Sequence, residues 1–259
     1  EPLPRADYLN RQGSALRDGV VDLLNGIVDY YIDLAPGAWG IQFTELSPQE
    51  EREAGLYDLL SEYLGETINA HYLGRTVPGV QFMLYSSEPI INDSIKGMSF
   101  RGTPMYFGVI EGLGGTPVTM PPTDVYEAVE RGVIEGFGWT ETGVIDFGWH
   151  EILTHIIDHP FYFTSTSVLI NRDKWNSLPK DVQNLLTESA IETEKKAADY
   201  YAEVKQTERK TLQEKGIQFV KFLPENEKKF YEIAEVTAWK KAAELSPDMA
   251  PKVKALINR

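Results

Sequence analysis

MSFRGTPMYFGVIEGLGGTPVTMPPTDVYEAVERGVIEGF, residues 98–137, alternates short apolar runs with short helical patterns. Gly114, Gly115 and Gly132 interrupt the stretch where helices would end. The pattern predicts strands at Met98–Phe100, Thr116–Met120 and Val133–Phe137, separated by helices at Pro104–Leu113 and Thr123–Arg131. Strands that alternate with short helices usually form a parallel sheet, so this stretch predicts an α/β fold.

Upstream of this stretch, the sequence predicts a helix followed by a buried strand at Val20–Val28 with parallel neighbours. Ser47, Pro48 and Glu50 have the order of a helix start, in which the serine caps the helix and the glutamate completes a capping box. We expect one helix from there to about Leu73, and then a strand at Gly79–Tyr85.

Downstream, Phe161–Asn171 is aromatic and β-branched and is the candidate crossover between two lobes. Apolar residues at helical spacing then predict a long helix from Pro179 to Gly216. At 1.5 Å per residue it would be about 55 Å long, so we expect it to brace both lobes. Ile217–Phe222 is a further strand candidate, and helices should follow it.

The composition excludes several classes of protein. A chain of 259 residues with 42% hydrophobic residues can form two cores. The net charge of −14 argues against a nucleic-acid partner, since such binding depends on cations that neutralise phosphates. No apolar run has the length of a membrane span, so we expect no direct membrane insertion. The absence of cysteine removes disulfides and thiolate chemistry.

Several segments, in one order, resemble the solute-binding proteins of tripartite ATP-independent periplasmic (TRAP) transporters. The likeness begins at the strand-to-helix turn Lys96–Pro104. It continues through the segments Leu113–Pro121, Val125–Ala128 and Gly132–Gly136, and then Val168–Asn171, Trp175, Leu178 and Pro179, and it includes Ala15–Asp22 upstream. Two departures stand out: the family's first strand, first helix and second strand have no counterpart before Glu1, and Phe137–Thr140 replaces a commonly polar run.

The resemblance implies a two-lobed periplasmic-binding-protein-like fold of the type II class, with parallel-rich sheets flanked by helices. We expect lobe I to comprise residues 1–84 and 168–215, lobe II residues 85–167, and the C-terminal segment 216–259 to pack across the lobes. The resemblance also implies a periplasmic protein that captures a small organic acid for the membrane permease subunits of a TRAP transporter. We expect no signal peptide in this chain. Neither a cofactor nor an enzymatic activity is implied.

Arg101 is the principal candidate for binding such an acid. It stands where a strand ends and a helix begins, and open parallel sheets bind ligands beyond the carboxyl ends of their strands. A guanidinium can hold a carboxylate through two parallel hydrogen bonds, which lysine cannot reproduce. In the family that the segment around Arg101 resembles, the matching arginine holds the ligand carboxylate. A second arginine of the family has no evident match near Tyr85.

Aromatic side chains supply the other candidates. Trp139 lies at the next strand end of the same edge, where its ring could cover a ligand held by Arg101. Tyr30, Tyr31 and Trp39 follow the first strand and would face the cleft, although such residues commonly serve packing alone. The ligand-binding candidates are Arg101, Trp139, Tyr30, Tyr31, Trp39 and Tyr85.

Three alternatives stay open. His150, Glu151, His155 and His159 could bind a metal, since Glu151, His155 and His159 would share one helical face, but the order of a zinc-protease motif is not met. Glu141 and Asp146 could be a general acid and base, but no nucleophile or histidine accompanies them at a meaningful spacing. The same scaffold could also belong to a ligand-sensing module or to an enzyme.

Overall fold

The computed structural model describes residues 5–257, which divide into two compact units. Unit 1 comprises the chain up to Gly79, Phe163–Tyr201 and the chain from Ala242. Unit 2 comprises Val80–Tyr162 and Ala202–Lys241. The division differs from the one expected. Residues 80–84 join unit 2 because they enter a strand that pairs with the core of that unit, and the segment 216–259 is divided between the units at residue 241.

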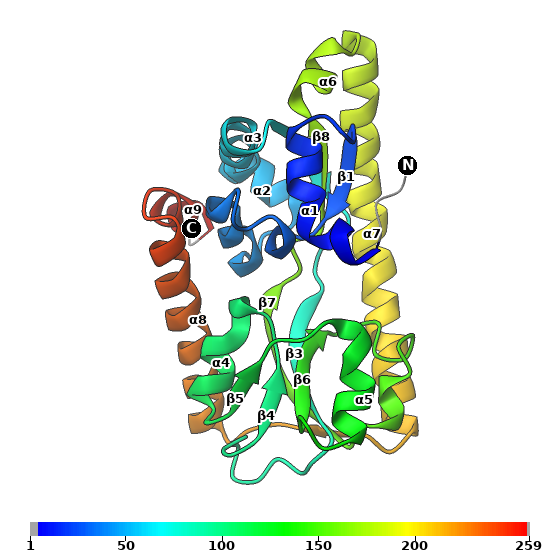
Figure 1. Cartoon of the computed structure of the whole chain (residues 1–259), viewed down its shortest axis with the longest axis vertical. Coiled ribbons are helices and arrows are strands. Elements are labelled where there is room, and N and C mark those ends of the chain that lie inside the picture. Colours follow the sequence, from blue (N-terminus) through cyan, green and yellow to red (C-terminus); the bar gives the residue numbers. More distant parts are fainter. Residues whose placement is uncertain (1–4, 258–259) are drawn as a thin grey trace. The chain divides into compact units, whose positions relative to one another are not determined.

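Unit 2 is built on a mixed six-stranded sheet with the order β5-β4-β6-β3-β7-β9 (Figure 1). β4 runs parallel to both β5 and β6, β3 runs antiparallel to β6, and β7 runs parallel to β9. The strands are β3 (Gln81–Ser86), β4 (Ser99–Arg101), β5 (Thr116–Val118), β6 (Gly136–Thr140), β7 (His155–Phe163) and β9 (Gln218–Val220). The parallel arrangement predicted for the decisive stretch is therefore present.

The last strand of that stretch begins later than predicted. β6 occupies Gly136–Thr140 and not Val133–Phe137. The amides of Val133 and Ile134 bond to the carbonyl of Ala128 and so close the end of the preceding helix, with Gly132 in the left-handed conformation. The two predicted helices are present within one residue of the predicted bounds, each as a 3-10 turn that continues into a short α-helix: Pro104–Tyr106 with α4 (Phe107–Gly112), and Pro122–Asp124 with α5 (Val125–Glu130).

Unit 1 contains a three-stranded sheet with the order β1-β8-β2. Its strands are β1 (Leu23–Gly26), β2 (Ala70–Arg75) and β8 (Ser167–Asn171). Both pairings are antiparallel, so the expectation of parallel neighbours for the first strand is wrong. The reason lies in β8, the central strand, which runs against both of its neighbours.

The helix expected from Ser47 to about Leu73 is broken. Its start is as predicted: Ser47 and Glu50 form a reciprocal capping box before α2 (Pro48–Ala54). Gly55 then adopts the left-handed conformation, with φ of 84°, and ends α2 before α3 (Leu56–Thr67) begins. β2 follows, a strand that the sequence reasoning assigned to the helix.

The long helix is confirmed as α7 (Lys180–Glu214), which contributes residues to both units. The remaining helical elements are α1 (Arg5–Arg17), 3-10 turns at Val28–Tyr30, Pro36–Phe43 and Trp149–Glu151, α6 (Arg172–Ser177), α8 (Pro224–Leu245) and α9 (Ala250–Ile257). In the described part of the chain, none of these helices combines the length and apolar character that a membrane span requires.

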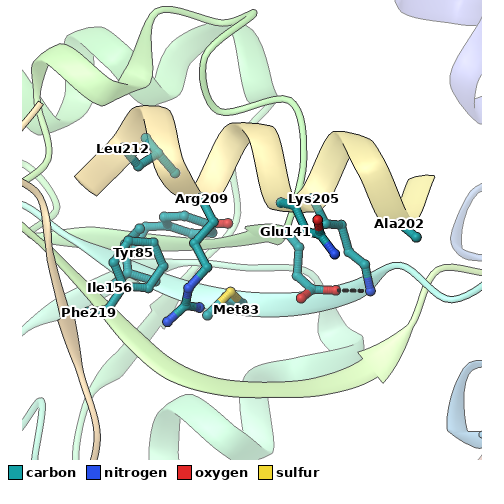
Figure 2. Close-up of a pocket in the computed structure, with 10 residues that line it drawn as sticks. Met83, Tyr85, Glu141, Ile156, Ala202, Lys205, Arg209, Leu212 and Phe219 are labelled. Atoms are coloured by element: carbon teal, nitrogen blue, oxygen red, sulfur yellow. Dashed lines mark ion pairs between the residues drawn. The ribbon is translucent and has the colours of Figure 1, made fainter. Parts of the chain in front are cut away.

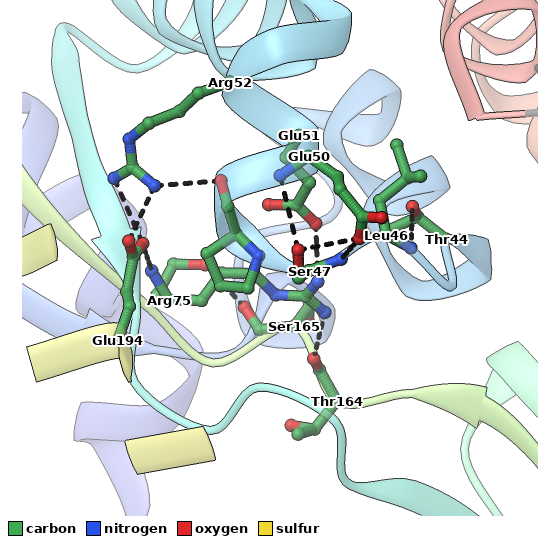
Figure 3. A network of polar contacts seen from close by, with 12 residues as sticks. Thr44, Leu46, Ser47, Glu50, Glu51, Arg52, Arg75, Thr164, Ser165 and Glu194 are labelled. Carbon is green, nitrogen blue, oxygen red and sulfur yellow. Dashed lines mark hydrogen bonds and ion pairs between the residues drawn. The ribbon is translucent and has the colours of Figure 1, made fainter. Parts of the chain in front are cut away.

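A network of buried charges joins four segments of unit 1 (Figure 3). Arg75, at the end of β2, donates from Nη1 to Glu51 at 2.6 Å and from Nη2 to the carbonyl of Thr164 at 2.8 Å. Glu194 of α7 accepts from the Arg75 amide and binds the guanidinium of Arg52. Burial raises the pKa of Glu51, and Arg75 opposes that rise.

Replacing Arg75 by methionine should lower the free energy of unfolding by about 3–5 kcal/mol at pH 7, because it leaves the buried carboxylate of Glu51 without a positive partner. Without Arg75, Glu51 binds a proton more tightly in the folded than in the unfolded state. Stability should therefore fall as the pH rises above the ordinary glutamate range, so the deficit is smaller at pH 5 than at pH 7. Urea titrations at the two pH values measure both effects.

The matched control is Arg131→Met, which removes the exposed partner of Glu127 and should change the free energy by less than about 0.5 kcal/mol. An Arg75→Met chain as stable as the wild type at pH 7 would contradict the structural role of the network.

Candidate functional site

The candidate site begins at the carboxyl ends of β4, β5 and β6. Arg101 is the last residue of β4, where it lies beside Val118 of β5 and Phe137 of β6. The amide of Gly102 still bonds to the carbonyl of Val118, so the pairing continues one residue beyond the strand. β4 and β5 thus end together at Arg101, and the parallel strand β6 passes beside it and ends at Thr140. This is the edge at which open α/β sheets bind ligands.

Protein groups hold the guanidinium of Arg101 in place. Nε donates to the carbonyl of Met120 at 3.1 Å, and Nη1 lies 3.2 Å from the hydroxyl of Tyr106 and 3.4 Å from the carbonyl of Gly138. Within residues 5–257, Nη2 makes no hydrogen bond. Since Nε and Nη1 already have partners, the nitrogen that stays available is Nη2. The two parallel hydrogen bonds expected between Arg101 and a carboxylate are therefore not preformed.

The charge of Arg101 has no counter-ion among the described residues. Arg101 is 5% exposed, and no carboxylate of those residues forms an ion pair with it. Arg75 is the other buried arginine of the described part, and it pairs with Glu51 at 2.6 Å. A buried charge is costly unless an opposite charge or hydrogen bonds compensate it. Arg101 has hydrogen bonds to protein groups and no opposite charge among the described residues, so its role in binding an anion stays a prediction.

Trp139 lies next to this guanidinium. The Cζ atom of Arg101 is 5.6 Å from the centre of the indole ring and lies over it. The half-buried indole packs edge-on against Trp149 and Phe147, with ring centres 4.9 and 5.4 Å away. The structure thus brings together the two leading candidates, Arg101 and Trp139, at one edge of the sheet. The arrangement joins a cation to an aromatic surface.

Sequence reasoning missed Tyr106 and Gly138. The buried Tyr106 hydroxyl donates to the carbonyl of Gly138 at 2.9 Å and accepts from Arg101 Nη1. A Cβ atom at Gly138 would overlap the Tyr106 ring, so only glycine lets the tyrosine approach β6 this closely. Glycine inside a strand marks such an approach, and the two glycines around Phe137 could have indicated it.

Tyr85 belongs to the core of unit 2. It is 1% exposed, stacks on Phe137 with ring centres 5.3 Å apart, and donates to the carbonyl of Thr140. Its other surroundings include a cavity of about 340 Å³ between the sheet and α7 (Figure 2). Neither Arg101 nor Trp139 lines that cavity.

The charges around that cavity are already balanced. Lys205 lies 3.4 Å from Glu141, and Arg209 makes two 2.7 Å bonds to Asp158 while its guanidinium covers the ring of Phe219. The cavity therefore offers an anion no surplus positive charge, in contrast to the end of β4.

Tyr30, Tyr31 and Trp39 belong to unit 1. Tyr31 is buried against Gly13, and Trp39 is buried with its ring edge-on to Phe43 at 5.9 Å. Tyr30 is half-buried. These contacts account for Tyr31 and Trp39 as packing residues of unit 1, and a role in ligand binding stays a prediction for all three.

The metal and catalytic alternatives find no support in the described residues. His155 and His159 lie on the strand β7 and not on a helix, and His159 Nε2 accepts from the amide of Phe222 at 2.8 Å. No cluster of three or more potential metal ligands occurs within residues 5–257. Glu141 accepts from the amide of Gln81 and pairs with Lys205, whereas Asp146 is exposed.

Comparison with known proteins assigns the chain to a family. The model of the bacterial extracellular solute-binding protein family 7, or DctP, matches residues 66–245, so the chain belongs to this family. It is 26% identical over 136 residues to a solute-binding protein of Sulfitobacter sp. (strain NAS-14.1). That match covers 51% of this chain and 41% of the relative, and the chain spans less than two thirds of three further curated relatives.

Solved structures share the fold. One is a TRAP periplasmic solute-binding protein from Desulfovibrio salexigens with bound orotic acid, with a TM-score of 0.82, 16% identity and coverage of 96% of this chain and 82% of that one. Another is a TRAP periplasmic solute-binding protein from Shewanella oneidensis with bound succinate, with a TM-score of 0.77, 16% identity and coverage of 96% and 84%. The chain therefore has the α/β fold of TRAP solute-binding proteins, with the mixed sheets and flanking helices described above.

Replacing Tyr106 by phenylalanine should lower the free energy of unfolding by about 1 kcal/mol, because it removes the donor to Gly138 and a partner of Arg101. Urea unfolding followed by circular dichroism measures the change. In the same unit, Tyr126→Phe removes an exposed hydroxyl bonded to Glu151 and should cost less than about 0.5 kcal/mol. Equal effects of the two substitutions would contradict the special position of Tyr106.

Proposed function

We propose that this chain is the ligand-binding part of an extracytoplasmic solute-binding protein that captures a small organic acid for a TRAP-type transporter. The observation that carries the proposal is Arg101, a buried guanidinium without a carboxylate partner among the described residues. A protein with a net charge of −14 does not attract anions as a whole. Binding of an acid must therefore depend on such a local cation.

The ligand that fits best has one carboxylate and an apolar or aromatic body. Arg101 Nη2 would bind the carboxylate, and the indole of Trp139 would form a wall for the body. Ligand sites are typically apolar with a few polar anchors, and a sugar acid would require more of these. Relatives of the same fold hold orotic acid and succinate, which supports a carboxylate as the recognised group.

The family supports a proposal for the compartment and the partner of the protein. Members of this family are bacterial extracellular solute-binding proteins, and solved relatives are periplasmic proteins of TRAP transporters. We propose the periplasm as the compartment and the membrane permease of a TRAP transporter as the partner. The protein would then deliver its ligand chemically unchanged.

A thermal-shift screen tests the proposal with benzoate, phenylpyruvate, orotate, succinate and glucuronate. We expect at least one acid to raise the melting temperature, because a ligand that binds the folded state stabilises it by mass action. Arg101→Lys should lower the affinity for that acid about tenfold or more in calorimetry, since lysine lacks the guanidinium geometry. Arg131→Met is the control and should bind as the wild type does. Wild-type affinity in Arg101→Lys and Arg101→Met would contradict the proposal.

Fluorescence tests the role of Trp139. Binding of an acid identified in the screen should quench or shift the tryptophan emission, and Trp139→Phe should remove most of this signal and weaken binding about 3- to 10-fold. Trp175→Phe is the matched control, because that indole stacks on His71 in unit 1. The signal and affinity should survive in the control. Unchanged affinity in Trp139→Phe and Trp139→Ala would make Trp139 a packing residue.

A further inference from the structure

Thr103 lies two residues beyond Arg101 and makes no use of its hydroxyl within the described chain. Its Oγ1 atom is buried and has no hydrogen-bond partner there. Thr103 is also the residue before the 3-10 turn Pro104–Tyr106, where threonine usually caps the free amides, but its side chain makes no capping bond. A buried hydroxyl without a partner costs about 1–3 kcal/mol. The fold retains this group at a cost in stability.

The backbone directs Thr103 to the side of the strand that carries Arg101. Thr103 is extended, with φ of −106° and ψ of 161°, and Gly102 continues the pairing to β5. Successive residues of an extended segment point to opposite faces, so Arg101 and Thr103 share one face. A Cβ atom at Gly102 would lie 3.0 Å from both Ile110 and Tyr106, which places the opposite face against α4 and the turn before it.

The hydrogen bonds of Arg101 leave a requirement for a second donor. Nε and Nη1 bond to protein groups, so the guanidinium offers a carboxylate Nη2 and not the parallel pair that usually binds both oxygens. A carboxylate held by one nitrogen keeps a second oxygen with no partner from Arg101. A hydroxyl can donate to that oxygen, since it rotates freely about its bond to carbon.

We propose that Thr103 is a second ligand-binding residue, whose hydroxyl donates to one carboxylate oxygen while Arg101 Nη2 donates to the other. The inference rests on the proposed function of the Arg101 site and specifies its geometry. It implies a threonine–arginine pair that recognises a single planar carboxylate. A single acid group is then sufficient for binding.

Valine substitution at Thr103 separates this role from packing, because valine has nearly the same shape and lacks the hydroxyl. Calorimetry with benzoate, phenylpyruvate, orotate, succinate and glucuronate should show that Thr103→Val weakens binding about tenfold or more for every acid that the wild type binds. Thr103→Ser keeps the hydroxyl and should retain most of the affinity. The ligand-free Thr103→Val chain should melt at the wild-type temperature or above it, because an unpaired buried polar group is gone.

Two controls make the outcomes distinct. Thr123→Val changes an exposed threonine of the same unit and should alter neither property, and Thr103→Ala gives a second chain without the hydroxyl. If Arg101→Lys loses affinity and Thr103→Val does not, or loses it only in step with a lower melting temperature, the role of Thr103 is overturned and the Arg101 site stands. If no acid binds the wild type, the proposed function and this inference fail together.

Discussion

The burial of one positive charge without a negative partner is the constraint on which the account depends. Residues 5–257 contain two buried arginines, and the positive charge of each is compensated in a different way. Arg75 is matched by Glu51 and ties together segments of unit 1, as a structural ion pair does. Arg101 is held by two backbone carbonyls and a tyrosine hydroxyl, which fix its position without neutralising its charge. Under the proposed function, an anion from outside the chain would supply the missing negative charge.

The surrounding fold can be understood as the support of that guanidinium. The parallel ends of β4, β5 and β6 bring Met120 and Gly138 within reach of one side chain. Gly138 has no side chain, and this lets Tyr106 approach closely enough to bond to the same carbonyl. The guanidinium also lies over the indole ring of Trp139, with Cζ 5.6 Å from the ring centre. Gly138 and Trp139 belong to β6, Met120 follows β5 and Tyr106 belongs to the turn before α4, so the geometry depends on several elements of unit 2.

Local chemistry explains which parts of this arrangement the sequence could predict. The Ser47 capping box, the long helix α7 and the place of Arg101 at a strand end depend on neighbours in the chain, and all three are present. The break at Gly55 and the strand β2 were missed because an apolar segment of that length suits a helix or a buried strand equally well. The antiparallel pairing in unit 1, the contact between Tyr106 and Gly138 and the missing counter-ion of Arg101 all depend on long-range packing, which no local pattern encodes.

A crystal structure with the acid of highest affinity would show whether Arg101 binds it. We expect one carboxylate oxygen within about 3.2 Å of Arg101 Nη2, with the bonds from Nε to Met120 and from Nη1 to Gly138 preserved. An acid bound elsewhere in the protein would contradict the claim. So would a carboxylate of the protein itself found against Arg101, because the buried charge would then need no ligand.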